Sequence, residues 1–76
     1  MDTQERIIRI IRENIPYAPK DIDATSRFLE DIQMDSLELF QLVALAEEEF
    51  HCTITDEFLE ECRTVEELAK YLDEQG

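Results

Sequence analysis

The chain has 76 residues, a formal net charge of −13, one Gly, two Pro and no Trp. A chain of this length buries only about 60% of its unfolded surface, so we expect residues 1–76 to form a single domain with a small core. No apolar run reaches the roughly 20 residues of a membrane span, the N-terminus lacks the apolar region of a signal peptide, and the negative charge would repel nucleic-acid phosphates. We therefore expect a cytoplasmic protein that neither inserts into membranes nor binds nucleic acid.

The charge is distributed unevenly along the chain. Residues 1–27 are balanced, whereas residues 28–76 carry fifteen acids against only Arg63 and Lys70. Such an acidic surface attracts partners with basic patches, or it serves solubility alone. The two cysteines, Cys52 and Cys62, form no CxxC pair, and with His51 they lack the paired spacing of a zinc site. We expect free thiols and no metal site.

The first predicted helix opens at Asp2, because Asp2-Thr3-Gln4-Glu5 has the form of a capping box. Isoleucines at helical spacing indicate one buried face, with charged residues on the other. Pro16 and Pro19 end this helix, since proline lacks the N–H of the ladder and disfavours the helical conformation of the residue before it. The isoleucines are Ile7, Ile8, Ile10, Ile11 and Ile15.

A long connection follows, up to about Asp35. Connections above roughly 12–15 residues are uncommon in small domains and are often functional. Apolar residues within it predict a structured crossover that is anchored on the core. These residues are Ile22, Phe28, Leu29 and Ile32.

Asp35-Ser36-Leu37-Glu38 is a second candidate capping box and starts the longest predicted helix, which runs to about Phe50. A helical wheel predicts a core face of Leu39, Leu42, Val43, Ala46 and Phe50, with Phe40 at its edge. The opposite side is both acidic and apolar, which is typical of a contact surface; alternatively, Leu37, Ala44 and Leu45 meet the loop or another helix. That side carries Leu37, Glu38, Gln41, Ala44, Leu45 and Glu48.

Two further helices complete the predicted fold. Thr55 or Asp56 caps a short helix, and Thr64-Val65-Glu66-Glu67 has the form of a third capping box. The last helix stops near Gly76 and buries a stripe formed by Val65, Leu68, Ala69 and Leu72. We therefore predict an all-α fold: a small bundle of three main helices plus one short helix, with a long structured loop between the first and second helices.

Ser36 is the main candidate for a functional residue. It stands at a helix N-terminus, where free N–H groups and the helix dipole favour a phosphate ester, and Asp35 already supplies the cap. A catalytic serine needs a base within hydrogen-bond distance, but the only histidine, His51, lies fifteen residues along the same helix, roughly 22 Å away. We therefore expect that the chain is not an enzyme. The simpler alternative is that Ser36 only starts the helix.

A wider pattern surrounds this serine: Phe28-Leu29-Glu30-Asp31-Ile32, Asp35-Ser36-Leu37, Leu42-Val43, Glu47-Glu48-Glu49-Phe50, Ile54 and Thr64-Val65. With these residues the chain resembles the acyl carrier protein family along nearly its whole length. The resemblance implies a 4′-phosphopantetheine arm on Ser36, attached by a phosphopantetheinyl transferase, whose thiol holds acyl intermediates as thioesters. It also implies a monomer whose bundle interior can shelter an acyl chain. Acyl-transferring and synthase enzymes with basic patches would dock on Asp35, Leu37, Glu38, Gln41, Ala44, Leu45, Glu47 and Glu48.

Several positions depart from the common pattern of that family. Gln33 stands where a glycine is usual, His51-Cys52 replaces Gly-Ile, and Thr55 replaces a frequent proline. Gln41 removes a common acidic docking residue, and Leu39-Phe40 is bulkier than usual. Fatty-acid, polyketide and related biosynthesis therefore all stay open, with a specialised pathway as an alternative to bulk fatty-acid synthesis. Two other functions stay open as well: an aminoacyl or peptidyl carrier of the same fold, and an unmodified acidic interaction domain.

Overall fold

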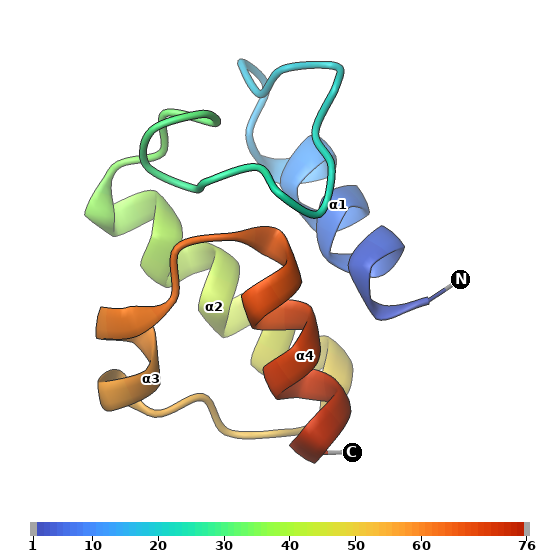
Figure 1. Cartoon of the computed structure of the whole chain (residues 1–76), viewed down its shortest axis with the longest axis vertical. Coiled ribbons are helices and arrows are strands. Elements are labelled where there is room, and N and C mark those ends of the chain that lie inside the picture. The colour runs from blue at the N-terminus through green and yellow to red at the C-terminus, as the bar shows by residue number, and fades with distance from the viewer. Residues whose placement is uncertain (1, 76) are drawn as a thin grey trace.

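Four helices follow one another along the chain in the computed structural model, which describes residues 2–75 (Figure 1). They are α1 (Thr3–Asn14), α2 (Ser36–Phe50), α3 (Asp56–Glu61) and α4 (Val65–Gln75). The prediction of an all-α bundle with three main helices and one short helix is confirmed. The predicted helix end near Gly76 lies outside the described residues. No helix within residues 2–75 is long and apolar enough to cross a membrane.

The helices begin where side chains cap them. Asp2 accepts a hydrogen bond from the N–H three residues ahead at 2.9 Å, and Thr55, rather than Asp56, caps α3 in the same way at 3.1 Å. Thr64 and Glu67 exchange both bonds of a capping box before α4, at 3.1 and 3.3 Å. These bonds satisfy N–H groups that the first helical turn leaves without partners, which is why short sequence signals located the helices correctly.

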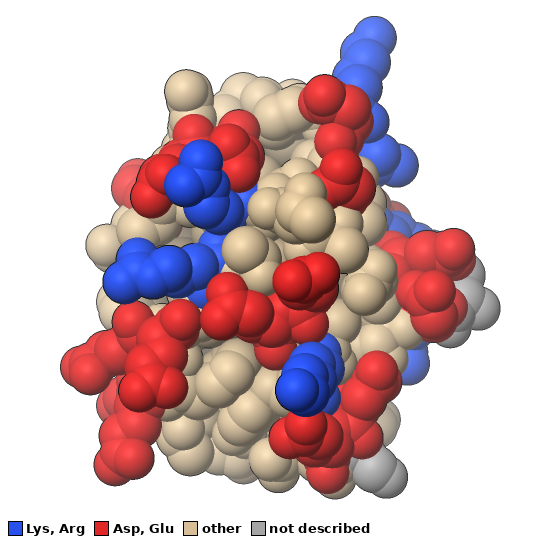
Figure 2. Space-filling model, in the orientation of Figure 1, with Lys and Arg blue, Asp and Glu red and all other residues tan. Residues whose placement is uncertain are grey.

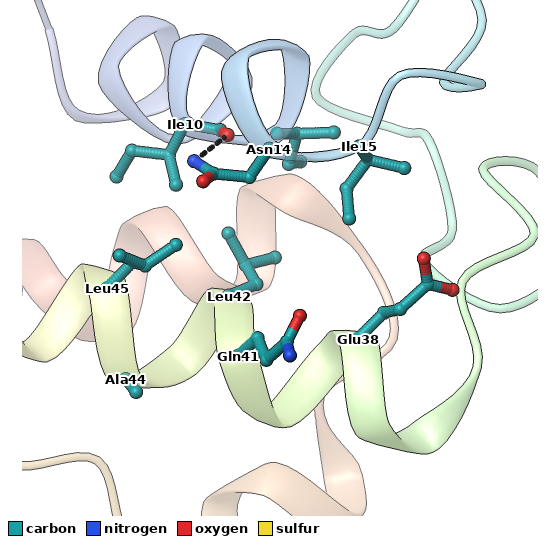
Figure 3. Close-up of a pocket in the computed structure, with 9 residues that line it drawn as sticks. Ile10, Asn14, Ile15, Glu38, Gln41, Leu42, Ala44 and Leu45 are labelled. Carbon is teal, nitrogen blue, oxygen red and sulfur yellow. Dashed lines mark hydrogen bonds between the residues drawn. The ribbon is translucent and has the colours of Figure 1, made fainter.

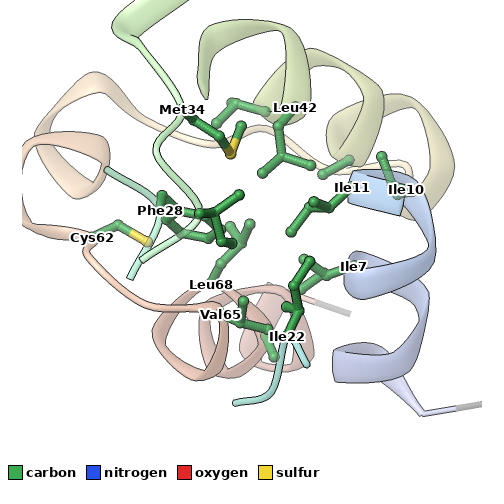
Figure 4. Close-up of a cluster of buried hydrophobic side chains, with 14 of the residues drawn as sticks. Ile7, Ile10, Ile11, Ile22, Phe28, Met34, Leu42, Cys62, Val65 and Leu68 are labelled. Carbon is green, nitrogen blue, oxygen red and sulfur yellow. The ribbon is translucent and has the colours of Figure 1, made fainter. Parts of the chain in front are cut away.

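The core is one cluster of buried side chains to which the crossover and the three long helices all contribute (Figure 4). The isoleucine face of α1 packs against both α4 and α2. Burial of one such side chain contributes about 1.5–3 kcal/mol, so this cluster is the main source of stability in so small a chain. The predicted core residues that are buried are Ile7, Ile10, Ile11, Ile15, Ile22, Phe28, Ile32, Leu42, Val43, Ala46, Val65, Leu68, Ala69 and Leu72, whereas Ile8, Leu39 and Phe50 are half-buried.

Backbone bonds hold the crossover between α1 and α2 against the segment that leads into α4. The Phe28 N–H donates to the Arg63 carbonyl at 2.9 Å, and the Val65 N–H donates to the Ser26 carbonyl at 3.2 Å. An isolated antiparallel bridge between Arg27 and Thr64 lies between these two bonds. The crossover is therefore a fixed part of the fold, which confirms the prediction of a structured loop.

The prediction that Leu29 anchors the crossover on the core is wrong. Leu29 is 52% exposed, whereas Phe28 and Ile32 are each 1% exposed. The Asp31 N–H closes a helical turn onto the Arg27 carbonyl at 3.0 Å. In such a turn residues four apart share a side, so Phe28 and Ile32 face the core together and Leu29 faces solvent.

The surface is strongly acidic. Acidic side chains spread across much of the face shown in Figure 2, while Lys and Arg form small separate groups. The short helix α3 alone carries four exposed acids, which are Asp56, Glu57, Glu60 and Glu61. The start of α2 lies beside this negatively charged helix, because Ser36 and Asp56 line the same hollow.

Candidate functional site

Ser36 is the first residue of α2, and it is exposed. The cap is supplied by Asp35, whose Oδ1 accepts from the Glu38 N–H at 2.8 Å, while Glu38 Oε1 accepts from the Asp35 N–H at 3.1 Å. This complete capping box leaves the serine out, and the Ser36 hydroxyl takes part in no side-chain hydrogen bond found among residues 2–75. The hydroxyl is thus accessible to another protein, at a helix terminus whose dipole and free N–H groups favour a phosphate ester.

The other serine of the chain is placed differently. Ser26 is half-buried in the crossover, and its Oγ accepts a hydrogen bond from the Asp23 N–H at 2.9 Å. Its hydroxyl therefore belongs to the internal bonding of a turn. Of the two serines, only Ser36 presents an exposed hydroxyl without such a bond.

Two residues just before the cap fix the path of the chain into Ser36. Gln33 has a φ of 65°, in the left-handed region that costs a residue with a Cβ about 1–2 kcal/mol. Met34 is 3% exposed, and its N–H donates to the Phe28 carbonyl at 3.0 Å. The sequence reasoning missed Met34 as a core residue because a loop has no periodicity; the available signal was one apolar residue between polar neighbours. The buried Met34 anchors the segment that presents Asp35 and Ser36.

Apolar side chains lie exposed around the serine. Leu37 is 67% exposed and Phe40 is 56% exposed. A hollow of about 410 Å³ lies between the first turns of α2 and the helix α3, lined by Ser36, Leu39, Phe40, Asp56, Leu59 and Glu60. An exposed apolar surface with an acidic rim is typical of a contact site for another molecule.

Comparison with known proteins decides the family. A family model described as a phosphopantetheine attachment site matches residues 5–72. This chain belongs to the acyl carrier protein family. Its relatives include the curated acyl carrier protein of Zymomonas mobilis, which is 38% identical over 73 residues, or 96% of this chain and 94% of the relative. They also include that of Bdellovibrio bacteriovorus, which is 36% identical over 76 residues, or 100% of this chain and 97% of the relative. A solved structure from Mycobacterium tuberculosis, assigned to the acyl carrier proteins, has a TM-score of 0.85 at 27% identity and covers 93% of this chain and 95% of its own.

Membership of the acyl carrier protein family makes this chain a carrier and not a catalyst. As a member of this family, the chain has a covalently attached 4′-phosphopantetheine. It interacts with the synthase and transferase enzymes that act on the carried group. The geometry of α2 agrees with this role, because Ser36 begins the helix and His51 is its C-cap. The only imidazole of the carrier therefore lies at the far end of α2 from the serine hydroxyl.

Glu38 is the most constrained of the acidic residues that were predicted to dock partners. Its Oε1 accepts from the Asp35 N–H and also from the hydroxyl of Tyr17, a crossover residue that is 53% exposed. The hydrogen bond to Glu38 raises the pKa of the Tyr17 phenol to about 12, because the phenolate would lose it and face a carboxylate. Sequence reasoning did not identify Tyr17, since no local pattern links it to Glu38, which is 21 positions away.

Glu47 has an internal role in the carrier. Its Oε2 accepts a hydrogen bond from the Ile54 N–H at 2.8 Å, and its side chain is half-buried. The carboxylate therefore ties the end of α2 to the loop before α3, on a different side of the helix from Glu38. The helical periodicity of α2 does not show whether the Glu47 carboxylate is bonded internally or is open to a docking partner.

The other predicted docking residues of α2 differ in how exposed they are. Leu37, Ala44 and Glu48 are exposed. Leu45 is half-buried against the core, and with Glu38, Gln41 and Ala44 it lines a groove between α1 and α2 (Figure 3). The alternative in which apolar residues of this side meet another helix is thus correct for Leu45, but Leu37 stays exposed.

The two cysteines are free thiols in the carrier. Cys62 is 8% exposed within the core, and burial raises its pKa to about 12. Cys52 is half-buried, and its pKa is raised by burial and by the nearby Glu47. No group of three His, Cys, Asp or Glu side chains among residues 2–75 has the arrangement of a metal site. Both thiols are therefore weakly nucleophilic side chains that pack in or beside the core.

Proposed function

We propose that Ser36 carries the 4′-phosphopantetheine arm through a phosphodiester. The observation that supports this most directly is the exposed hydroxyl at the first residue of α2, which is left unbonded because Asp35 supplies the cap. The residues present fit the group: the N–H groups of the first turn and the helix dipole stabilise a negative ester, and Ser36 is exposed.

On the arm, a terminal thiol holds the acyl group as a thioester, and the protein's part is to position and present it. The capping box and the buried Met34 fix the point of attachment. The tether then replaces free diffusion by a high effective concentration of the carried group at each partner enzyme. The apolar hollow beside Ser36, lined in part by Phe40 and Leu59, offers a place for an acyl chain. The pathways served are fatty-acid, polyketide or related biosynthesis.

The docking face that we propose for partner enzymes consists of Asp35, Leu37, Glu38, Gln41, Ala44, Leu45, Glu47 and Glu48. Its partners are a phosphopantetheinyl transferase and acyl-transferring or synthase enzymes with basic patches, because the acidic charge steers such surfaces together and permits fast release. Glu47 contributes through its charge, since its carboxylate already accepts an internal hydrogen bond. The net charge of −13 favours a monomer through self-repulsion, and free thiols support a reducing, cytoplasmic location.

Coexpression with a promiscuous phosphopantetheinyl transferase tests the attachment site. Intact mass spectrometry should show the added mass of the arm on the wild-type chain and its complete loss in Ser36→Ala. Ser26→Ala is the matched control, because it removes the only other serine hydroxyl and should leave the modification intact. A modified Ser36→Ala chain would place the arm elsewhere, and a wild-type chain left unmodified by several transferases would favour an unmodified interaction domain.

A further inference from the structure

A side chain of the crossover reaches the capping box that contains Ser36. The Tyr17 hydroxyl donates to Glu38 Oε1, the same oxygen that accepts from the Asp35 N–H at 3.1 Å. Asp35 Oδ1 in turn accepts from the Glu38 N–H at 2.8 Å. Among residues 2–75, no other side chain from outside the Asp35–Glu38 segment bonds to this box. A single carboxylate oxygen therefore joins the crossover to the cap on which the position of Ser36 depends.

The turn that carries Tyr17 is itself fixed. The Ala18 N–H donates to the Ile15 carbonyl at 3.1 Å, with Pro16 and Tyr17 at the centre of the turn. A proline at the first central position presets the backbone angle that such a turn requires. Ile15 is 4% exposed and Ala18 packs against the core, so both ends of the turn are anchored. The Tyr17 ring is consequently held at a defined place outside the core.

Glu38 lies within reach of this turn. It stands across the groove between α1 and α2 from Ile15, the first residue of the turn (Figure 3). A glutamate side chain loses much rotamer freedom when it is fixed, and this entropy opposes the closed capping box. The bond from Tyr17 favours the rotamer in which Oε1 also meets the Asp35 N–H. Because the pKa of Tyr17 is raised to about 12, its hydroxyl stays a donor at neutral pH.

The placement of Ser36 matters for the attachment of the arm. In the transfer, the Ser36 oxygen forms a bond to the phosphorus of a phosphopantetheine that is joined to a nucleotide. The P–O bond to the nucleotide breaks, and the serine proton passes to a base of the transferase. Such a step needs the reacting atoms about 3–3.5 Å apart and aligned. Since no side-chain bond within residues 2–75 holds the hydroxyl, its placement depends on the backbone of residues 35–38.

We propose that Tyr17 is a positioning residue for the modification of Ser36: it holds Glu38 in the capping box and so keeps the serine backbone in the geometry that the transferase accepts. The proposal rests on the proposed function of Ser36. Without the bond, the cap opens more often, and a smaller fraction of the bound carrier is ready to react. This role is separate from partner docking, because the neutral Tyr17 adds no charge to the surface.

Tyr17→Phe tests the proposal, because it removes only the hydroxyl. The rate at which Ser36 acquires the arm is followed by intact mass spectrometry over a range of carrier concentrations. We expect kcat to fall about three- to tenfold, the factor that results when the free energy of one hydrogen bond is lost from the transition state alone. KM should change by less than about twofold, because the net charge is the same.

Tyr71→Phe is the matched control. It removes a phenol hydroxyl that donates to the Thr53 carbonyl at 3.2 Å, beyond the other end of α2, and should leave kcat unchanged. A merely structural role of Tyr17 gives a different signature. Loss of stability alone lowers the folded fraction of the carrier, which raises the apparent KM and leaves kcat as it is.

Two further measurements connect the rate to the bond. Nitrogen-15 relaxation of the full chain without the arm should show that Tyr17→Phe lowers the order parameters of Asp35, Ser36 and Leu37 from about 0.85 toward about 0.6, with Leu42 unaffected. In a Glu38→Ala background, Tyr17→Phe should have no further effect on kcat, because both variants break the same contact.

Three outcomes would overturn the proposal: an unchanged kcat in Tyr17→Phe, a rise in KM alone, or an equal loss of kcat with and without the Glu38 side chain. Unchanged order parameters at Asp35 and Ser36 would do the same. Failure of the proposed function has a different result, because the wild-type chain would then gain no arm, or an arm that maps to another residue. That result removes the basis of this proposal as well, whereas the outcomes above leave Ser36 as the attachment site.

Discussion

Within residues 2–75, two residues other than glycine adopt the left-handed backbone conformation, and they lie at the two ends of the helix that carries the site. Gln33 precedes the α2 cap with a φ of 65°, and His51 is the C-cap of α2 with a φ of 54°. Both stand at positions where the resemblance to the family led us to expect glycine. The backbone geometry is thus retained although the side chain disfavours it, by about 1–2 kcal/mol at each position.

Replacing either residue by glycine should stabilise this carrier. Gln33→Gly and His51→Gly are each expected to raise the free energy of unfolding by about 0.5–1 kcal/mol, because relief of the left-handed conformation exceeds the added entropy of the unfolded chain. Gln41→Gly, in the interior of α2, is the matched control and should lower it by about 1 kcal/mol. Urea unfolding provides the measurement. Destabilisation by both left-handed substitutions would contradict this account.

The bond between Tyr17 and Glu38 should be visible in a pH titration. Tyr71→Phe leaves Tyr17 as the only tyrosine, and phenolate absorbance should then report a pKa of about 12 instead of the ordinary 10.0. Because folding raises this pKa, the stability that Tyr17 contributes is complete below pH 10 and is lost as the pH rises through about 12. Adding Glu38→Gln should move the midpoint back toward the ordinary value. An unshifted midpoint with Glu38 present would disprove the contact.

At the scale of the elements, local sequence signals were sufficient to predict the helices but not to predict the path of the crossover. Caps depend on residues within one turn of each other, so Asp2, Asp35 and Thr64 predicted helix starts correctly from sequence. The path of the crossover depends on pairing with the segment before α4, which no spacing encodes. For that reason Leu29 was wrongly placed in the core and Met34 was missed.

The local features of the candidate site were predictable from sequence, but its contacts between elements were not. Ser36 and its capping box follow from four consecutive residues, and the structure has them as predicted. The partners of Glu38 and Glu47 come from Tyr17 and Ile54, outside the helix, and the groove needs α1 beside α2. A helical wheel describes one helix alone, so it does not distinguish a carboxylate that is bonded internally from one that is open to a partner.

The separate contributions of Asp35 and Ser36 to helix capping can be measured directly. Asp35→Ala removes the cap and should lower the free energy of unfolding by about 1 kcal/mol. Ser36→Ala should change it by less than about 0.5 kcal/mol, because the hydroxyl makes no side-chain bond in the fold. Urea unfolding of the two variants without the arm decides the point. An equal loss in both would show that Ser36 takes part in the cap.

At the scale of the whole molecule, charge is the dominant feature. Fifteen acids lie in residues 28–76 against two basic residues, and the surface ion pairs of the crossover and α1 involve only part of this excess. Self-repulsion of this kind lowers stability while it keeps the carrier soluble and attractive to basic surfaces.

Salt should therefore stabilise the fold. Screening becomes effective as the Debye length falls from about 30 Å at 0.01 M to about 8 Å at 0.15 M ionic strength, so the melting temperature should rise by several degrees over this range. Circular dichroism gives the measurement, and equimolar sucrose is the control because it adds no ionic screening. A melting temperature that does not respond to sodium chloride would argue that the acids are too far apart to repel one another.

The central claim is that Ser36 is an attachment point whose chemistry is carried out by partner enzymes. Mass spectrometry of the intact protein from its native host, followed by peptide mapping, tests it most directly and shows any acyl cargo at the same time. We expect a phosphopantetheine mass that maps to Ser36. A native protein without the arm, or with the arm on any other residue, would contradict it.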